Sequence, residues 1–285
     1  MGIAFIHFYL PRVITETKNP IIELFRSKKE YTNSTQLETF TFKSFDNNNL
    51  VAQITRSQQD STFGTIILVH GIRSNKSYYN DLTKKLSING FNCVGIDLRA
   101  HGESEGSHCT FGVKEKRDVS ALLDHLPKEN IDISKVGIWG QSLGGAVALQ
   151  SLGTDHRIRF GIVESTFTDF RSIVHDYFEY HMGFRNETIS NYLVDRSAKI
   201  AGFDPEDANP KKYCQQITQP VLIVHGDKDQ RISITYGREN FTAILSENKE
   251  FLPIANANHL NVHQTGGEEY FITVLSFIGS VLDDS

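Results

Sequence analysis

Trp139-Gly140-Gln141-Ser142-Leu143-Gly144-Gly145 is the feature around which this chain is organised, because a β-rich run, residues 135–139, stops there and an Ala/Leu helix pattern, residues 146–152, starts at once. The pattern Gly-x-Ser-x-Gly is typical of a sharp strand-to-helix turn with the serine at its apex, since small residues on both sides avoid a collision. The N–H groups and positive dipole end of the following helix point toward that serine. Ser142 is therefore a candidate nucleophile, and the N–H of Leu143 is a candidate donor to a developing oxyanion.

Strand and helix patterns alternate on both sides of this turn. The β-branched run 65–69 is typical of a strand buried on both faces. Before it, alternating residues around Asp46-Asn47-Asn48-Asn49 predict an antiparallel edge hairpin. We expect further strands over 91–98, 160–164, 220–224 and 249–254, and helices over 78–88, 113–126, 234–245 and 268–282. The alternation predicts an α/β fold with a mostly parallel sheet and helices on both faces.

The alternation breaks over residues 167–209, which contain no strand-like run. Two helical patterns, 170–180 and 189–200, occur before Pro205 and Pro210 end the segment. We expect a helical insertion over the carboxyl edge of the sheet. Its aromatic residues either line an apolar pocket or pack the insertion onto the body: Tyr177, Phe178, Tyr180, Phe184, Tyr192 and Phe203.

The composition limits the number of domains and the kinds of partner. With 285 residues, 39% of them hydrophobic, the chain is long enough for one α/β domain, residues 36–285, after a leader and connector, residues 1–35. A net charge of −5 without a Lys/Arg-rich run argues against nucleic acid as a partner. Cys93, Cys109 and Cys214 are too few and too scattered for a disulfide framework or a Cys-x-x-Cys metal site.

The N-terminal apolar segment, residues 3–10, is too short to span a bilayer and lacks the upstream charge and cleavage site of a signal peptide. Either it is an amphipathic leader that packs on the body or lies on a membrane, or the natural chain has a longer anchor. Residues 18–35 read as a polar connector. The sequence favours a cytoplasmic location, with membrane association through the N-terminus as the alternative, and leaves the oligomeric state open.

A candidate acid follows the strand at 220–224. Ligands bind at the carboxyl ends of the strands in an open parallel sheet. In His225-Gly226-Asp227-Lys228-Asp229, a carboxylate can accept a hydrogen bond from an imidazole N–H and fix its tautomer. Asp229 is favoured because the Gly-x-x-Asp spacing lets the turn complete first. Asp227 is the alternative, and it otherwise reads as a turn residue that bonds its own loop.

A candidate base follows the last strand, in Ala257-Asn258-His259-Leu260-Asn261-Val262-His263. His259 lies nearer the strand end and is favoured as the general base that reaches Ser142, with His263 as the alternative. The order Ser, Asp, His on successive strand ends supports this assignment.

Two other strand ends carry polar residues. In His70-Gly71-Ile72-Arg73, the turn can aim the N–H of Ile72 at the same point as that of Leu143, and His70 reads as a structural imidazole bonded to its own loop. In the segment 97–104, Asp97 and Arg99 read as structural residues that pair with each other or with backbone.

Together these motifs resemble the α/β-hydrolase superfamily, and within it the serine-aminopeptidase-like and esterase-like hydrolases, from about residue 37 to the C-terminus. The motifs are His70-Gly71, Asp97 to Ser104, Gly140 to Gly145, His225 to Asp229, and Ala257 to His259. Ala100 and Asn258 depart from the pattern, since glycine is usual at both positions.

The resemblance implies a helical cap between the sixth and seventh strands, where residues 167–209 lie. It also implies a nucleophile, Ser142, an acid, Asp229, a base, His259, and oxyanion N–H groups from Ile72 and Leu143.

We expect a hydrolase that needs no cofactor or metal and cleaves esters of small or medium acyl groups through an acyl-enzyme. Its partner is then a small-molecule acyl substrate. A peptidase, an amidase or a thioesterase with the same triad is the enzymatic alternative. A non-catalytic protein that binds a ligand in the cleft is the alternative from another class.

Overall fold

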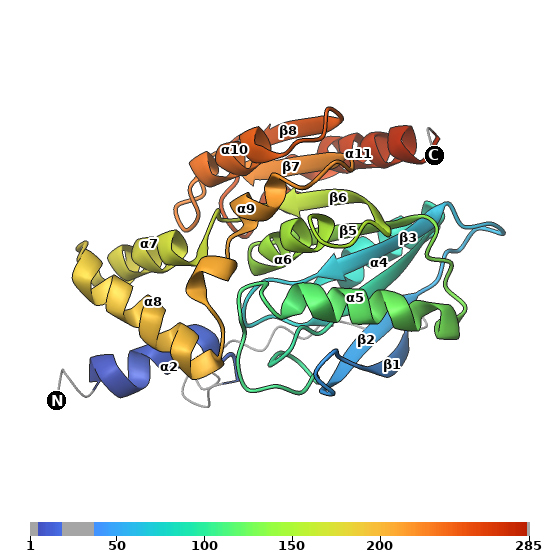
Figure 1. The fold of residues 1–285 in the computed structure, drawn as a ribbon. Helices are drawn as coiled ribbons and strands as arrows, with labels where there is room; N and C mark the ends of the chain where they lie inside the picture. Colours follow the sequence, from blue (N-terminus) through green and yellow to red (C-terminus); the bar gives the residue numbers. More distant parts are fainter. Residues whose placement is uncertain (1–4, 19–36, 284–285) are drawn as a thin grey trace.

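The β-branched run of the sequence forms β3 in the interior of the sheet. The computed structural model describes residues 5–18 and 37–283, and its strands follow the order β1-β2-β4-β3-β5-β6-β7-β8 (Figure 1). The strands are β1 (Glu38–Lys43), β2 (Asn49–Thr55), β3 (Gly64–Val69), β4 (Phe91–Ile96), β5 (Val136–Gln141), β6 (Ile158–Glu164), β7 (Val221–Gly226) and β8 (Lys249–Ile254).

The direction of the strands confirms the predicted fold class. β1 pairs antiparallel with β2, and β2 pairs antiparallel with β4. The pairs from β4 through β3 to β8 are parallel. The carboxyl ends of the parallel strands therefore share one edge of the sheet, where ligands bind in such folds.

Helices cover both faces of the sheet because successive side chains of a strand point to opposite faces. Ile67 and Val69 of β3 belong to an apolar core with α5 and α6, whereas Ile66 and Leu68 belong to a second core with α4 and α11. The helices outside the insertion and the N-terminal segment are α4 (Asn80–Ile88), α5 (Glu115–His125), α6 (Leu143–Leu152), α9 (Pro210–Cys214), α10 (Ile234–Ala243) and α11 (Val262–Asp283). Short helices η2 (Lys76–Tyr79), η3 (Leu126–Glu129) and η4 (Pro205–Asp207) complete the connections.

The final helix begins earlier than the predicted residue 268. α11 starts at Val262 and has a kink at Gly267, whose φ of 59° is left-handed. Glycine adopts that conformation without the steric cost of a Cβ. The extra first turn places His263 on the helix, directly after the loop that contains His259.

The two longest helices between β6 and β7 lie where the insertion was expected. These are α7 (Phe170–Met182) and α8 (Glu187–Ala201), and they lie at one end of the molecule in Figure 1. Phe170, Phe178 and Val194 are buried in the same core as α5 and α6. Of the insertion's other aromatic residues, Tyr180, Phe184 and Tyr192 are exposed.

The N-terminal segment, as far as it is described, is helical and lies along α8 (Figure 1). It comprises a π-helical turn, η1 (Phe5–Tyr9), and a short helix, α2 (Leu10–Thr15). The leader thus packs on the body, one of the two arrangements expected of it. Apart from Lys18, the predicted connector 18–35 lies outside the described residues. Within the described ranges, every helix is too short or too polar to cross a bilayer.

Candidate active site

Ser142 occupies a sharp turn between β5 and α6. Its backbone has φ 58° and ψ −120°, a conformation that costs on the order of 1–3 kcal/mol in an L residue and needs support from its surroundings. Two hydrogen bonds supply that support. The N–H of Ser142 donates to the carbonyl of Glu164 at 2.9 Å, and the hydroxyl of Thr166 donates to the carbonyl of Ser142 at 2.7 Å.

The glycines on both sides of Ser142 are required by close backbone contacts. A Cβ on Gly140 would lie 2.1 Å from the carbonyl oxygen of Gly144, and a Cβ on Gly144 would lie 1.9 Å from the carbonyl oxygen of Val69. Both distances are far inside van der Waals contact. The steric reason given for the Gly-x-Ser-x-Gly pattern is therefore confirmed at both positions.

His259 links the serine to a carboxylate. Its Nε2 is 3.1 Å from Oγ of Ser142, and its Nδ1 is 2.7 Å from Oδ2 of Asp229. All three residues are buried. A neutral imidazole that donates from Nδ1 to Asp229 has its Nε2 lone pair free to accept the serine proton, which is the arrangement that a general base needs.

The turn after β7 aims Asp229, not Asp227, at His259. The second carboxylate oxygen of Asp229 accepts the N–H groups of Arg231 and Ile232, both at 2.9 Å. Asp227 is exposed and accepts the N–H of Asn256 at 2.7 Å. Asp227 is thus a turn residue, and Asp229 is held in place by backbone donors.

A second histidine near Asp229 stays neutral. His225 has its Nε2 2.9 Å from the carbonyl of Ile232 and 3.6 Å from Asp229. Burial lowers the pKa of His225 below its usual value. An uncharged imidazole there does not compete with His259 for the carboxylate.

His263, the alternative base, is directed at a different residue. Its Nε2 lies 2.8 and 2.9 Å from the carboxylate oxygens of Glu164. Glu164 also accepts hydrogen bonds from Trp139 and Tyr270. Burial alone would raise the pKa of Glu164, but the positive charge of His263 and these hydrogen bonds outweigh it, and the pKa is lowered. His263 and Glu164 therefore form an ion pair beneath the loop of His259.

The two expected oxyanion donors flank the serine. Ile72 and Leu143 line the same cavity as Ser142, and a Cβ on Gly71 would lie 3.5 Å from Cβ of Ser142. His70 holds this loop, since its Nδ1 is 2.7 Å from the carbonyl of Gly71 and its Nε2 accepts the N–H of Leu98 at 3.1 Å. The structural role expected of His70 agrees with these bonds.

Asp97 and Arg99 are structural, as expected. Asp97 accepts the backbone N–H of Glu103 at 2.9 Å, which agrees with the expected pairing with backbone, and it also pairs with Lys76 at 2.8 Å. Arg99 makes two hydrogen bonds to Asp118, at 2.6 and 2.7 Å. The two residues do not pair with each other, the other expected arrangement, because Lys76 and Asp118 are their charged partners.

Gln141 supports the site and was not singled out from the sequence. Its Nε2 donates to the carbonyl of His259 at 3.0 Å, and its Oε1 accepts the hydroxyl of Tyr78 at 2.5 Å. The residue before the serine thus holds the backbone of the histidine. The sequence signal for Gln141 was a polar side chain at the end of a strand whose other residues are apolar or glycine.

A largely apolar cavity of about 220 Å³ opens beside Ser142. α2, α7 and α8 contribute to its wall, and so does Ile232 after β7. Tyr177 and Phe178 of the insertion line it, whereas Tyr180, Phe184, Tyr192 and Phe203 do not. Tyr177 and Phe178 thus line the cavity and Phe203 packs against the core, whereas neither expectation describes the exposed Tyr180, Phe184 and Tyr192.

A family model described as "Serine aminopeptidase, S33" matches residues 60–203. Among curated proteins, the chain is 25% identical over 236 residues to YuxL of Bacillus subtilis, named as an uncharacterized peptidase, with 79% of this chain and 35% of that protein covered. It is 26% identical over 230 residues to the uncharacterized protein YfhR of Escherichia coli, with 79% and 73% covered. The chain thus spans about a third of the length of YuxL.

Solved structures share the fold. The esterase Pf2001 of Pyrococcus furiosus superposes with a TM-score of 0.73 at 22% identity, covering 90% of this chain and 96% of that one. A putative dipeptidyl aminopeptidase IV from Bacteroides ovatus superposes with a TM-score of 0.63 at 15% identity, covering 86% and 36%. The two matches carry different activities in their names, so they show the architecture and leave the substrate undetermined.

Proposed function

This chain belongs to the serine aminopeptidase family, S33, of the α/β hydrolases, and from that premise we propose that it hydrolyses carboxylic esters through an acyl-enzyme formed on Ser142. The observation that carries the proposal is the hydrogen-bonded series from Asp229 through His259 to Ser142, with distances of 2.7 and 3.1 Å. Such a series activates a serine hydroxyl that is otherwise a weak nucleophile.

In the first step, His259 takes the proton of Ser142 as the serine oxygen attacks the ester carbonyl. Asp229 stabilises the imidazolium that forms. The carbonyl oxygen becomes an oxyanion, to which the N–H groups of Ile72 and Leu143 donate. His259 then gives its proton to the departing alcohol, leaving the acyl group on Ser142.

In the second step, water attacks the acyl-enzyme with His259 again acting as the base. The proton returns to Ser142 when the acid leaves. Both steps use the N–H groups of Ile72 and Leu143 and the imidazole of His259, so one arrangement of these groups is sufficient for the whole reaction.

The lining of the cavity favours an ester over a peptide with a free amino terminus. An aminopeptidase must bind a protonated amine, for which a carboxylate is the usual partner. None of the described residues that line the cavity beside Ser142 is Asp or Glu. A peptidase or amidase remains the second candidate because the family description and the name of YuxL point to it, and a thioesterase would use the same triad.

The test is a panel of p-nitrophenyl acyl esters, acyl thioesters and aminoacyl anilides, assayed with the wild type and Ser142→Ala. Ester turnover that Ser142→Ala abolishes supports the proposal, and faster turnover of anilides favours the peptidase. A fluorophosphonate that leaves Ser142 unlabelled in the wild type would indicate the non-catalytic alternative.

A further inference from the structure

The cavity beside Ser142 does not include His259 in its wall. Ser142, Leu143 and Ile72 line it, whereas His259 and Asp229 do not. His259 must protonate the departing alcohol, so the alcohol leaves on the side of the imidazole. The acyl chain then extends in the other direction, into the cavity.

One face of α2 closes the cavity on its outer side. Leu10, Val13 and Ile14 line it, and their spacing of three and four residues places them on one stripe of the helix. Arg12, between them, is exposed and pairs with Glu16. The N-terminal helix therefore presents an apolar stripe to the same space that Ser142 faces.

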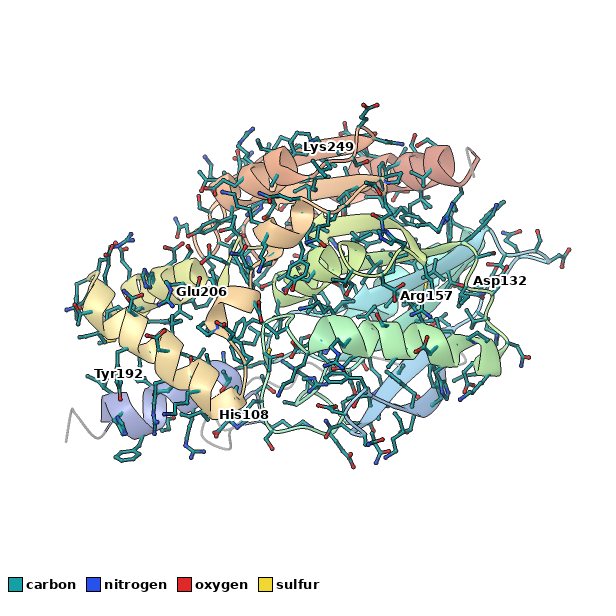
Figure 2. The ribbon with its side chains drawn as sticks, viewed as in Figure 1. His108, Asp132, Arg157, Tyr192, Glu206 and Lys249 are labelled. Atoms are coloured by element: carbon teal, nitrogen blue, oxygen red, sulfur yellow. The ribbon has the colours of Figure 1, made fainter. Side chains whose placement is uncertain are left out.

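Hydrogen bonds attach this segment to the body. The carbonyl of Thr15 accepts the N–H of Cys109 at 2.9 Å, and its hydroxyl is 3.1 Å from Nδ1 of His108. Nδ1 of His7 is hydrogen-bonded to the hydroxyl of Tyr192 on α8. Figure 2 shows both body residues, His108 and Tyr192, beside the N-terminal segment. α2 is thus a fixed part of the wall.

A further bond connects α2 to the loop after β3 that carries Ile72. The guanidinium of Arg73 donates to the carbonyl of Val13. Val13 lies in the last turn of α2, whose carbonyls have no partner within the helix, and a cation there also complements the helix dipole. Since Arg73 follows Ile72 directly, the position of α2 is tied to that of this loop.

We propose that α2 is the outer wall of an acyl-chain pocket and limits the length of the acyl group, an inference that rests on the proposed ester hydrolysis. An apolar cavity of about 150 Å³ holds one benzene, which has six carbons. By the same proportion, a cavity of about 220 Å³ holds about nine carbons. We therefore expect the best substrates to be esters of medium-chain acids, about eight to ten carbons long.

The experiment measures kcat/KM for p-nitrophenyl esters of increasing acyl length, from acetate to myristate. The wild type should be fastest at octanoate or decanoate. Ile14→Trp fills the pocket and should lower the ratio of kcat/KM for octanoate to kcat/KM for acetate by about tenfold or more. Ile14→Ala enlarges the pocket and should move the optimum to longer chains.

Arg12→Ala is the matched control, because it lies on the same helix but outside the pocket, and its chain-length profile should match the wild type. A series of alkyl acetates, in which only the alcohol varies, should show the same dependence on alcohol length in Ile14→Trp and in the wild type. A far-UV circular dichroism spectrum and a Tm close to those of the wild type report that the variants fold.

Esterase activity with one chain-length profile in the wild type and both Ile14 variants overturns the role of α2 alone. A change confined to the alkyl acetates overturns the assignment of the cavity to the acyl group. A wild type that neither hydrolyses any ester nor reacts with a fluorophosphonate at Ser142 overturns the proposed function, and the acyl pocket with it.

Discussion

At the scale of single residues, hydrogen bonds to the backbone hold the side chains of the site in one geometry. Asp229 accepts two backbone N–H groups on one oxygen and the imidazole on the other. The backbone bonds hold the carboxylate so that its free oxygen meets Nδ1 of His259. A residue in this position fixes the tautomer of the imidazole as well as its orientation.

Asp229→Asn should therefore keep the fold and reduce kcat on an aryl ester by roughly ten-thousand-fold, because the amide permits the wrong tautomer. Ser142→Ala should cost about a million-fold. Asp227→Asn is the matched control, since Asp227 bonds the backbone N–H of Asn256 and not His259, and it should keep most of the activity. A larger loss in Asp227→Asn than in Asp229→Asn would show that the acid has been misassigned.

Ala100 gives a prediction about stability. Its φ of 61° is left-handed and it is buried, and that conformation costs an L residue about 1–2 kcal/mol. Replacing a buried Ala by Gly loses about 0.8 kcal/mol for the methyl group and about 1 kcal/mol through the freedom of glycine in the unfolded chain. At Ala100 the relief of strain offsets these losses.

We expect Ala100→Gly to change the free energy of unfolding by less than about 1 kcal/mol, as measured by urea denaturation. Ala148→Gly is the control. Ala148 is equally buried but lies within α6, and this variant should be about 1.5–2 kcal/mol less stable than the wild type. Equal losses at both positions would mean that Ala100 is not strained.

At the scale of elements, the loop of His259 is held between β5 and α11. Gln141 of β5 donates to the carbonyl of His259, and His263 at the start of α11 pairs with Glu164 at the end of β6. Burial alone would lower the pKa of His263, but the carboxylate of Glu164 outweighs it, and the pKa is raised. The loop is thus anchored on both sides of the imidazole of His259.

The contribution of this ion pair to the free energy of unfolding changes with pH, and the direction of the change follows from the two shifted pKa values. A raised pKa of His263 means that its contribution is complete below the usual value of about 6.5 and is lost as pH rises through the folded pKa. The lowered pKa of Glu164 means that its contribution is present above about 4.5 and is lost only as pH falls through its folded pKa.

His263→Gln should therefore lower the free energy of unfolding most near pH 5–6, by about 1–3 kcal/mol, because the histidine is one-third exposed. The difference from the wild type should shrink toward pH 9. His259 stays in place, so His263→Gln should keep most of its esterase activity at pH 7. A deficit in stability that is constant with pH would contradict the ion pair, and an inactive His263→Gln would contradict His259 as the base.

Elements that are local in sequence could be predicted, whereas contacts between distant elements could not. The strand, turn and helix around Ser142 follow from steric rules that act within seven residues, and the order of the strand ends predicts which side chains meet. The partner of Arg99 was mispredicted because Asp118 lies on α5, 19 residues further along the chain, and only the packing of that helix in the fold brings the two side chains together. The preference for Asp229 over Asp227 could be argued from the sequence because it depends on the geometry of one turn.

At the scale of the whole molecule, the cavity beside Ser142 joins parts of the chain that are far apart in sequence. α2, the loop after β3, the insertion and Ile232 all contribute to its wall. The sequence showed an apolar leader and an aromatic insertion, but no local pattern reveals that they enclose one space. The contribution of α2 depends on its packing along α8, which only the folded chain defines.

A ligand that fills this cavity should stabilise the molecule and restrict α2 in particular. An octyl trifluoromethyl ketone adds reversibly to a serine nucleophile and places its chain where the acyl group is proposed to lie. At a hundredfold excess over its Kd it should stabilise the fold by about 2.7 kcal/mol, which corresponds to a rise in Tm of about 5–10 °C. Hydrogen exchange should slow in residues 10–15 because opening of α2 then requires loss of the ligand.

The control is methyl trifluoromethyl ketone, which carries a methyl group in place of the octyl chain. At equal occupancy it should raise Tm without protecting α2, since its short chain does not reach Val13 or Ile14. Equal protection of α2 by both ketones would show that the effect comes from Ser142 alone, and no protection by either would place the octyl chain outside the cavity.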